Sequence, residues 1–116
     1  MLFGAGGDRD PGKRSEMGQI ASNVADRVII TDDNPRSEDP ATIRAAILSM
    51  APGAETVTPR ADAILAAIGA LREGDVLVIA GKGHEQGQII GDETLPFDDV
   101  LVARAAIKSL DAEAGQ

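Results

Sequence analysis

The sequence has no cysteine, tryptophan or tyrosine, and only two phenylalanines among its 116 residues. Without cysteine, the chain has neither disulfides nor thiolate metal ligands, which is compatible with a reducing cytoplasm. The scarcity of aromatic side chains argues against a surface that stacks on bases or sugars. The core must therefore be built from Ala, Val, Ile and Leu, as in layered α/β domains.

Long hydrophobic runs are also absent, and positive charge is in the minority. No apolar run approaches the length of a membrane span, and the first residues are too short in hydrophobic length for a signal peptide. Because 11 Lys and Arg stand against 19 Asp and Glu, the net charge is -8, which repels a nucleic-acid backbone. We therefore expect a cytoplasmic protein with neither a membrane nor a nucleic-acid partner.

The length fits one domain over residues 1–116, with a disordered tail at 111–116. Hydrophobic patterning predicts buried strands that alternate with helices. The expected strands are 2–3, 28–31, 55–57 and 76–80, followed by a hairpin at 88–95 around Gly91-Asp92. The expected helices cover 13–25, start at Pro40 and Pro59, and finally cover 100–110.

Three apolar stripes are expected to face the core of this domain. They comprise Met17, Ile20, Ala21 and Val24; then Ile43, Ala46, Ile47 and Met50; and then Ile64, Leu65, Ile68 and Leu71. The segment 76–80 is continuously apolar, so we expect a strand that is covered on both faces.

Alternating strands and helices predict an α/β fold, a Rossmann-like three-layer domain with a mostly parallel sheet and helices on both faces. Ligands of such sheets bind at the carboxyl ends of the strands. Three polar loops follow strands here, at 4–14, 32–39 and 81–88. We expect these loops to meet on one edge of the sheet.

The first loop resembles the start of a phosphate-binding P-loop, but it does not complete the motif. Residues 7–13 fit G-x-x-x-x-G-K, whereas Arg14 stands where Ser or Thr would hold magnesium. Asp8 and Asp10 within the loop would also repel phosphate. An independent P-loop nucleoside triphosphatase is therefore not expected. A single histidine with scattered carboxylates predicts no metal site either.

The second and third loops carry groups that suit an amino acid. Arg36 and Asn34 can hold a carboxylate, although a solvated turn explains them too. Glu85 can accept from an ammonium group, with a plain surface glutamate as the alternative. For His84, a structural hydrogen bond within its loop is favoured over acid or base chemistry. The combination of charges suggests a zwitterionic ligand.

The motifs together resemble the third domain of the MurE group of Mur ligases, over nearly the whole chain. The segments that carry this resemblance are Gly4-Ala5-Gly6-Gly7-Asp8-Arg9-Asp10 with Gly12-Lys13-Arg14, Thr31-Asp32-Asp33-Asn34-Pro35-Arg36, and Gly81-Lys82-Gly83-His84-Glu85 with Gln88. The tetrapeptide at 33–36 is similar to the family's diaminopimelate signature. Relatives that use L-lysine differ there, most tellingly at the arginine.

The resemblance implies a substrate site but no catalytic residue and no metal ligand in this chain. The residues implied to bind meso-diaminopimelate are Arg9, Asp33, Asn34, Arg36, Gly81 and Glu85. Lys13, Arg14 and Lys82 are expected to face the nucleotide phosphates, and His84 is expected to support its loop. An Arg36–Glu85 pair would then clamp the remote end of the diamino acid.

The resemblance also implies a reaction that needs more than this chain. In the family, ATP and Mg²⁺ activate the D-glutamate carboxylate of UDP-N-acetylmuramoyl-L-alanyl-D-glutamate, and the incoming amine attacks the acyl phosphate. The nucleotide and precursor sites, and most of the third domain's first strand and helix, are expected upstream, so the chain alone should not catalyse. The alternatives are a free-standing diamino-acid-binding module, and the same domain of an L-lysine-adding or folylpolyglutamate-type ligase.

Overall fold

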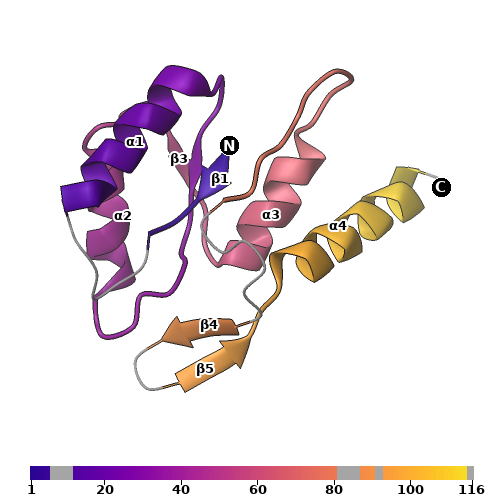
Figure 1. Cartoon of the computed structure of the whole chain (residues 1–116). Coiled ribbons are helices and arrows are strands. Elements are labelled where there is room, and N and C mark those ends of the chain that lie inside the picture. Colours follow the sequence, from indigo (N-terminus) through magenta and orange to yellow (C-terminus); the bar gives the residue numbers. More distant parts are fainter. Residues whose placement is uncertain (6–11, 81–86, 91–92, 115–116) are drawn as a thin grey trace.

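The computed structural model describes residues 1–5, 12–80, 87–90 and 93–114 (Figure 1). Four helices lie in this part of the chain: α1 (Gly12–Val24), α2 (Pro40–Leu48), α3 (Arg60–Gly69) and α4 (Asp99–Ala114). The described strands are β1 (Leu2–Phe3), β2 (Ile29–Ile30), β3 (Glu55–Thr56), β4 (Gly87–Ile90) and β5 (Glu93–Pro96). The order of helices and strands agrees with the predicted α/β alternation.

The central sheet is parallel, with the strand order β1-β2-β3. Helices α1 and α2 pack together on one side of it, and α3 and α4 pack together on the other (Figure 1). This arrangement confirms the three-layer α/β class. The hairpin predicted around residues 91 and 92 is also present, as the antiparallel pair β4-β5, and it forms a separate sheet.

The two faces of the sheet bury alternate side chains, because successive residues of a strand point to opposite sides. Phe3 and Ile30 contribute to a core with α1 and α2, whereas Leu2 and Ile29 contribute to a core with α3. Aliphatic side chains and alanine dominate both cores, as the composition predicts.

The segment 76–80 was predicted to be a strand buried on both faces, and the structure shows otherwise. It runs parallel to β1 through one bridge, Leu2 with Ile79, with hydrogen bonds from Leu2 N to Val78 O (2.8 Å) and from Ala80 N to Leu2 O (2.9 Å). Val76 is 84% exposed, and Val78 is 48% exposed. Among the described residues, the segment therefore lies at an edge of the sheet, and its continuously apolar sequence does not make it buried on both faces.

Parts of the predicted helix stripes were also wrong. Ile20 (63%) and Val24 (75%) are exposed, and so are Met50, Leu65 and Leu71. On α1, Ala21 is buried as predicted, but the other buried positions are Arg14 and Gly18. The face is displaced because Gly18 lies against the backbone of Ile47 in α2, so close helix packing, not hydrophobicity, selects the inward side.

The local sequence predicts the start of α2 better than it predicts the buried faces of the helices. Asp39 caps α2, since its side chain accepts a hydrogen bond from Ala41 N (3.0 Å), and Pro40 occupies the first position. Helix α4 begins at Asp99 and continues through Ala114, beyond its predicted end at Leu110. None of the helices in the described part of the chain is long and apolar enough to cross a bilayer.

Candidate functional site at the carboxyl ends of the strands

The loop after β2 holds the tetrapeptide 33–36 in a largely buried position. Asp33, Asn34 and Pro35 are buried, and Arg36 is partly exposed. A turn built only for solvation would leave these groups in water, so burial favours a fixed backbone over the solvated-turn interpretation. The loop is therefore a preformed feature of this edge.

Arg36 adopts a backbone conformation that is rare for residues other than glycine. Its φ is 52°, in the left-handed region, and its Nη1 lies 3.4 Å from Asn34 O. Such a conformation costs about 1–3 kcal/mol and persists where surrounding contacts determine it. Arg36 is thus held at the end of the loop by its surroundings.

The glycine-rich loop after β1 approaches this loop closely. A Cβ on Gly4 would lie 2.6 Å from Thr31 O and 2.8 Å from Asp33 N. Only glycine permits this contact between two backbones. The first and second loops therefore begin side by side, as expected for neighbouring parallel strands.

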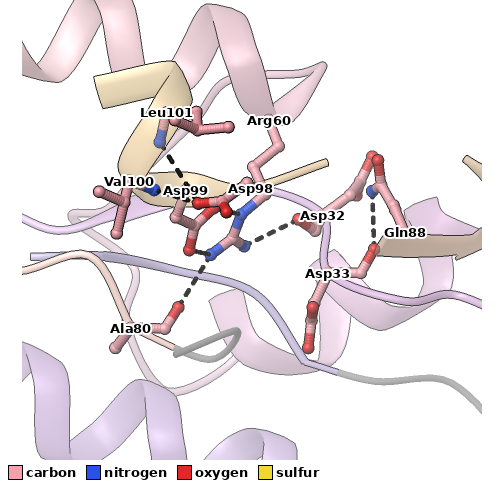
Figure 2. A network of polar contacts seen from close by, with 9 residues as sticks. All are labelled: Asp32, Asp33, Arg60, Ala80, Gln88, Asp98, Asp99, Val100 and Leu101. Atoms are coloured by element: carbon pink, nitrogen blue, oxygen red, sulfur yellow. Dashed lines mark hydrogen bonds and ion pairs between the residues drawn. The ribbon is translucent and has the colours of Figure 1, made fainter. Parts of the chain in front are cut away.

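Side chains from several elements hold the loop after β2. Arg44 of α2 contacts the Asp32 carboxylate at 2.6 Å, and Arg14 of α1 pairs with Glu38 at 2.9 Å. Gln88 of β4 donates to Asp33 O at 2.7 Å, which joins the hairpin to the loop (Figure 2). The resulting loop is preorganised, so a ligand would not have to order it.

One further arginine, Arg60, lies under this edge, and no motif in the sequence points to it. Arg60 is 1% exposed at the start of α3, and it forms a two-pronged pair with Asp99 of α4. It also donates to Asp32 O (3.0 Å) and Ala80 O (3.1 Å) (Figure 2). A cation in the first turn of a helix is disfavoured by the positive end of the helix dipole. An arginine at that position in the sequence therefore indicates that specific acceptors hold it.

The predicted site residues divide into those that the structure describes and those outside it. Asp33, Asn34 and Arg36 lie together on the loop after β2, and Gln88 reaches the same loop. Lys13 is exposed in the first turn of α1, whereas the buried Arg14 is engaged by Glu38. The residues outside the described part of the chain are Arg9, Gly81, Lys82, His84 and Glu85, so the Arg36–Glu85 clamp stays a prediction.

A hollow of about 510 Å³ lies at the other end of the sheet. Its lining includes Met1, Ile29, Asp75 and Val76, which stand at the amino ends of the parallel segments. It carries none of the predicted substrate residues. Within the described residues, moreover, no group of three acidic or histidine side chains is placed to hold a metal ion.

Comparison with known proteins assigns the family. The model of the family described as "Mur ligase, glutamate ligase domain" matches residues 1–83, which is more than half of the chain. The chain belongs to this Mur ligase family. The Mur ligase domain is also similar to a solved structure titled "Structure of UDP-N-acetylmuramoyl-L-alanyl-D-glutamate--2, 6-diaminopimelate ligase", with a TM-score of 0.86 and 40% identity over 95% of this chain.

Curated relatives of this Mur ligase domain carry that same ligase name. A protein of Caulobacter vibrioides is 60% identical over 96% of the chain, and one of Zymomonas mobilis is 62% identical over 92% of it. A Bradyrhizobium diazoefficiens protein is 62% identical over 94%. The chain spans only 22–23% of the length of these relatives, and 24% of the solved structure.

Proposed function

We propose that this Mur ligase domain is the carboxy-terminal, amino-acid-recognising part of an ATP-dependent ligase. The ligase adds meso-diaminopimelate to UDP-N-acetylmuramoyl-L-alanyl-D-glutamate in cell-wall synthesis in the bacterial cytoplasm. The single observation that carries the proposal is the 60–62% identity to ligases of that name, which extends over more than nine-tenths of the chain. The tetrapeptide 33–36 lies within that matched length.

The site supports recognition of a diamino dicarboxylic acid. Arg36 offers a planar fork that pairs with a carboxylate in two-pronged fashion, and Asn34 adds amide donors. We assign Arg9, Asp33, Gly81 and Glu85 to the same site, with Glu85 accepting from the ammonium group. L-lysine lacks the remote carboxylate, so Arg36 would lose its partner and L-lysine would bind less well.

The domain's contribution to the reaction is positioning. ATP supplies the activation of the precursor carboxylate, and the chain's own residues hold the attacking amine in place, which lowers the entropic part of the barrier. Lys13 in the exposed first turn of α1 suits a phosphate, since the helix dipole adds to its charge. Arg14 is already paired with Glu38, so its predicted phosphate contact would have to displace an ion pair.

A direct test uses the ligase that carries this chain as its carboxy-terminal domain. Phosphate release is measured with meso-diaminopimelate and with L-lysine, in the wild type and in Arg36→Gln. We expect the variant to lose about 100-fold in kcat/KM for meso-diaminopimelate, because removing one partner of a buried charge pair costs about 2–5 kcal/mol. Activity with L-lysine should change little.

The matched control is Arg72→Gln, which removes an arginine from an exposed position outside the site. It should leave both activities unchanged. A wild-type preference for L-lysine would overturn the substrate assignment. Equal losses with both amino acids in Arg36→Gln would overturn the role of Arg36.

The main alternative is a free-standing module that binds diamino acids. Titration calorimetry of the isolated chain with meso-diaminopimelate separates the two proposals. The ligase assignment expects no tight binding without the nucleotide and precursor. Tight binding by the chain alone would favour the module instead.

A further inference from the structure

Arg60 is a buried arginine whose guanidinium contacts three separate parts of the chain. Its guanidinium donates from Nε and Nη2 to the two Asp99 carboxylate oxygens, both at 2.8 Å. Its Nη1 and Nη2 also reach the carbonyl oxygens of Asp32 and Ala80 (Figure 2). One buried side chain thus joins α3 and α4 to two backbone positions at the sheet edge.

Each of the two carbonyls belongs to the residue directly before a predicted site segment. Asp32 directly precedes the tetrapeptide 33–36, and Ala80 directly precedes the loop that begins at Gly81. These are the two loops that we propose to bind the remote end of the diamino acid together, with Arg36 on one loop and Glu85 on the other. The Arg60 guanidinium donates to both carbonyls, so it connects the starting points of the two loops.

The chemistry of arginine suits this task, and that of lysine does not. A guanidinium is flat and rigid and offers five donors in fixed directions, whereas an ammonium group is a single point on a flexible stem. A buried ion pair is weak evidence for stability, since well-packed apolar residues often stabilise as much or more. The fixed directions are therefore the property that this position uses.

Neighbouring contacts make the same positions stiff. The Asp32 side chain is held by Arg44 at 2.6 Å while its carbonyl is held by Arg60, and Gln88 holds the carbonyl of Asp33. A small displacement at Arg60 would consequently shift the loop as a unit.

We propose that Arg60, oriented by Asp99, is a positioning residue that sets the separation of the two amino-acid-binding loops and thereby contributes to selection of a diamino dicarboxylic acid. This inference rests on the proposed function, because it needs the two loops to bind one ligand. Arg60 itself contacts the loops' backbone and not the substrate.

The test uses Arg60→Lys in the complete ligase, with steady-state kinetics for each of the three substrates. We expect the KM for meso-diaminopimelate to rise by about 10- to 100-fold, since a misplacement of about 1 Å is sufficient for such losses. The KM values for ATP and for the precursor should stay unchanged. The preference for meso-diaminopimelate over L-lysine should fall.

Asp99→Asn is the second variant. It keeps the shape of the Asp99 side chain but weakens its hydrogen bonds to Arg60, so it should disturb the position of the guanidinium less than Arg60→Lys does. It should raise the KM for meso-diaminopimelate and lower the preference over L-lysine, each by a smaller factor than Arg60→Lys. Arg27→Lys is the matched control, since Arg27 pairs with Glu55 at an exposed site. That variant should leave all three KM values unchanged. Thermal unfolding of each variant shows whether it is folded at the assay temperature.

The outcomes separate this inference from the proposed function. A wild-type ligase that prefers L-lysine defeats the proposed function. A wild type that prefers meso-diaminopimelate, with folded Arg60→Lys and Asp99→Asn variants that keep its KM and preference, defeats the positioning role alone. Equal rises of all three KM values, with the preference intact, would make Arg60 a purely structural residue and also overturn the inference.

Discussion

Gly18 shows at the scale of one residue how packing can override helix propensity. Glycine inside a helix costs about 1 kcal/mol relative to alanine. Gly18 is nevertheless buried in α1, at a point where an added Cβ would clash with the carbonyl oxygen of Ile47. The missing side chain lets α1 approach α2, the helix that follows the candidate site loop.

Gly18→Ala should lower the free energy of unfolding by about 1–3 kcal/mol, because overpacking against a backbone carbonyl outweighs the propensity gain. The measurement is the midpoint of urea unfolding. Gly69→Ala in α3 is the matched control, since its nearest new contact is Leu110 Cδ1 at an ordinary 3.9 Å. That variant should be neutral or stabilising. Equal stabilisation by both substitutions would contradict the close approach of α1 and α2.

At the scale of elements, α2 connects a local capping signal to the site. Asp39 ends the loop that holds Asn34 and Arg36, and it also begins the helix by accepting from Ala41 N. The helix then presents Arg44 back to Asp32. A correct start of α2 is therefore needed for the ion pair that holds the loop.

Asp39→Ala should destabilise the protein by about 1 kcal/mol, since one amide at the helix start loses its partner. Asp39→Asn keeps a capping oxygen, so it should stay within a few tenths of a kcal/mol of the wild type. Thermal or urea unfolding measures both. An Asn variant as unstable as the Ala variant would show that charge, not capping, is the important property of Asp39.

At the scale of the whole molecule, the described part of the sheet has an exposed apolar segment at one edge. Val76 and Val78 are exposed beside β1, and in the described part of the chain no further strand pairs with the outer side of segment 76–80. Such edges favour association between chains. The isolated chain is therefore expected to self-associate through this edge.

Val76→Lys and Val78→Lys should each reduce concentration-dependent association, measured by sedimentation velocity. Lysine on an edge strand opposes pairing with another chain. Val24→Lys is the matched control, because Val24 is similarly exposed (75%) but lies on α1 and not at a strand edge. Equal reduction by all three substitutions would point to general surface hydrophobicity and not to edge pairing.

Local chemistry was sufficient to predict much of this protein. The Asp39-Pro40 helix start, the hairpin around residues 91 and 92, and the parallel order implied by alternating elements are all confirmed. The motif resemblance indicated the correct family, because glycine and polar residues at fixed spacing reflect loop geometry directly. These features depend on residues that are close together in the sequence, so they can be recognised without the structure.

What only the tertiary structure decided are the features that depend on distant partners. The inward face of α1 follows from Gly18 meeting Ile47, and the exposure of Val76 follows from its place at an edge. Arg60 is the clearest case, since Asp99, Asp32 and Ala80 lie 39, 28 and 20 residues from it along the chain. Contacts between residues so far apart in the sequence form only in the folded sheet. The periodicity of hydrophobic residues and the local motifs therefore do not predict them.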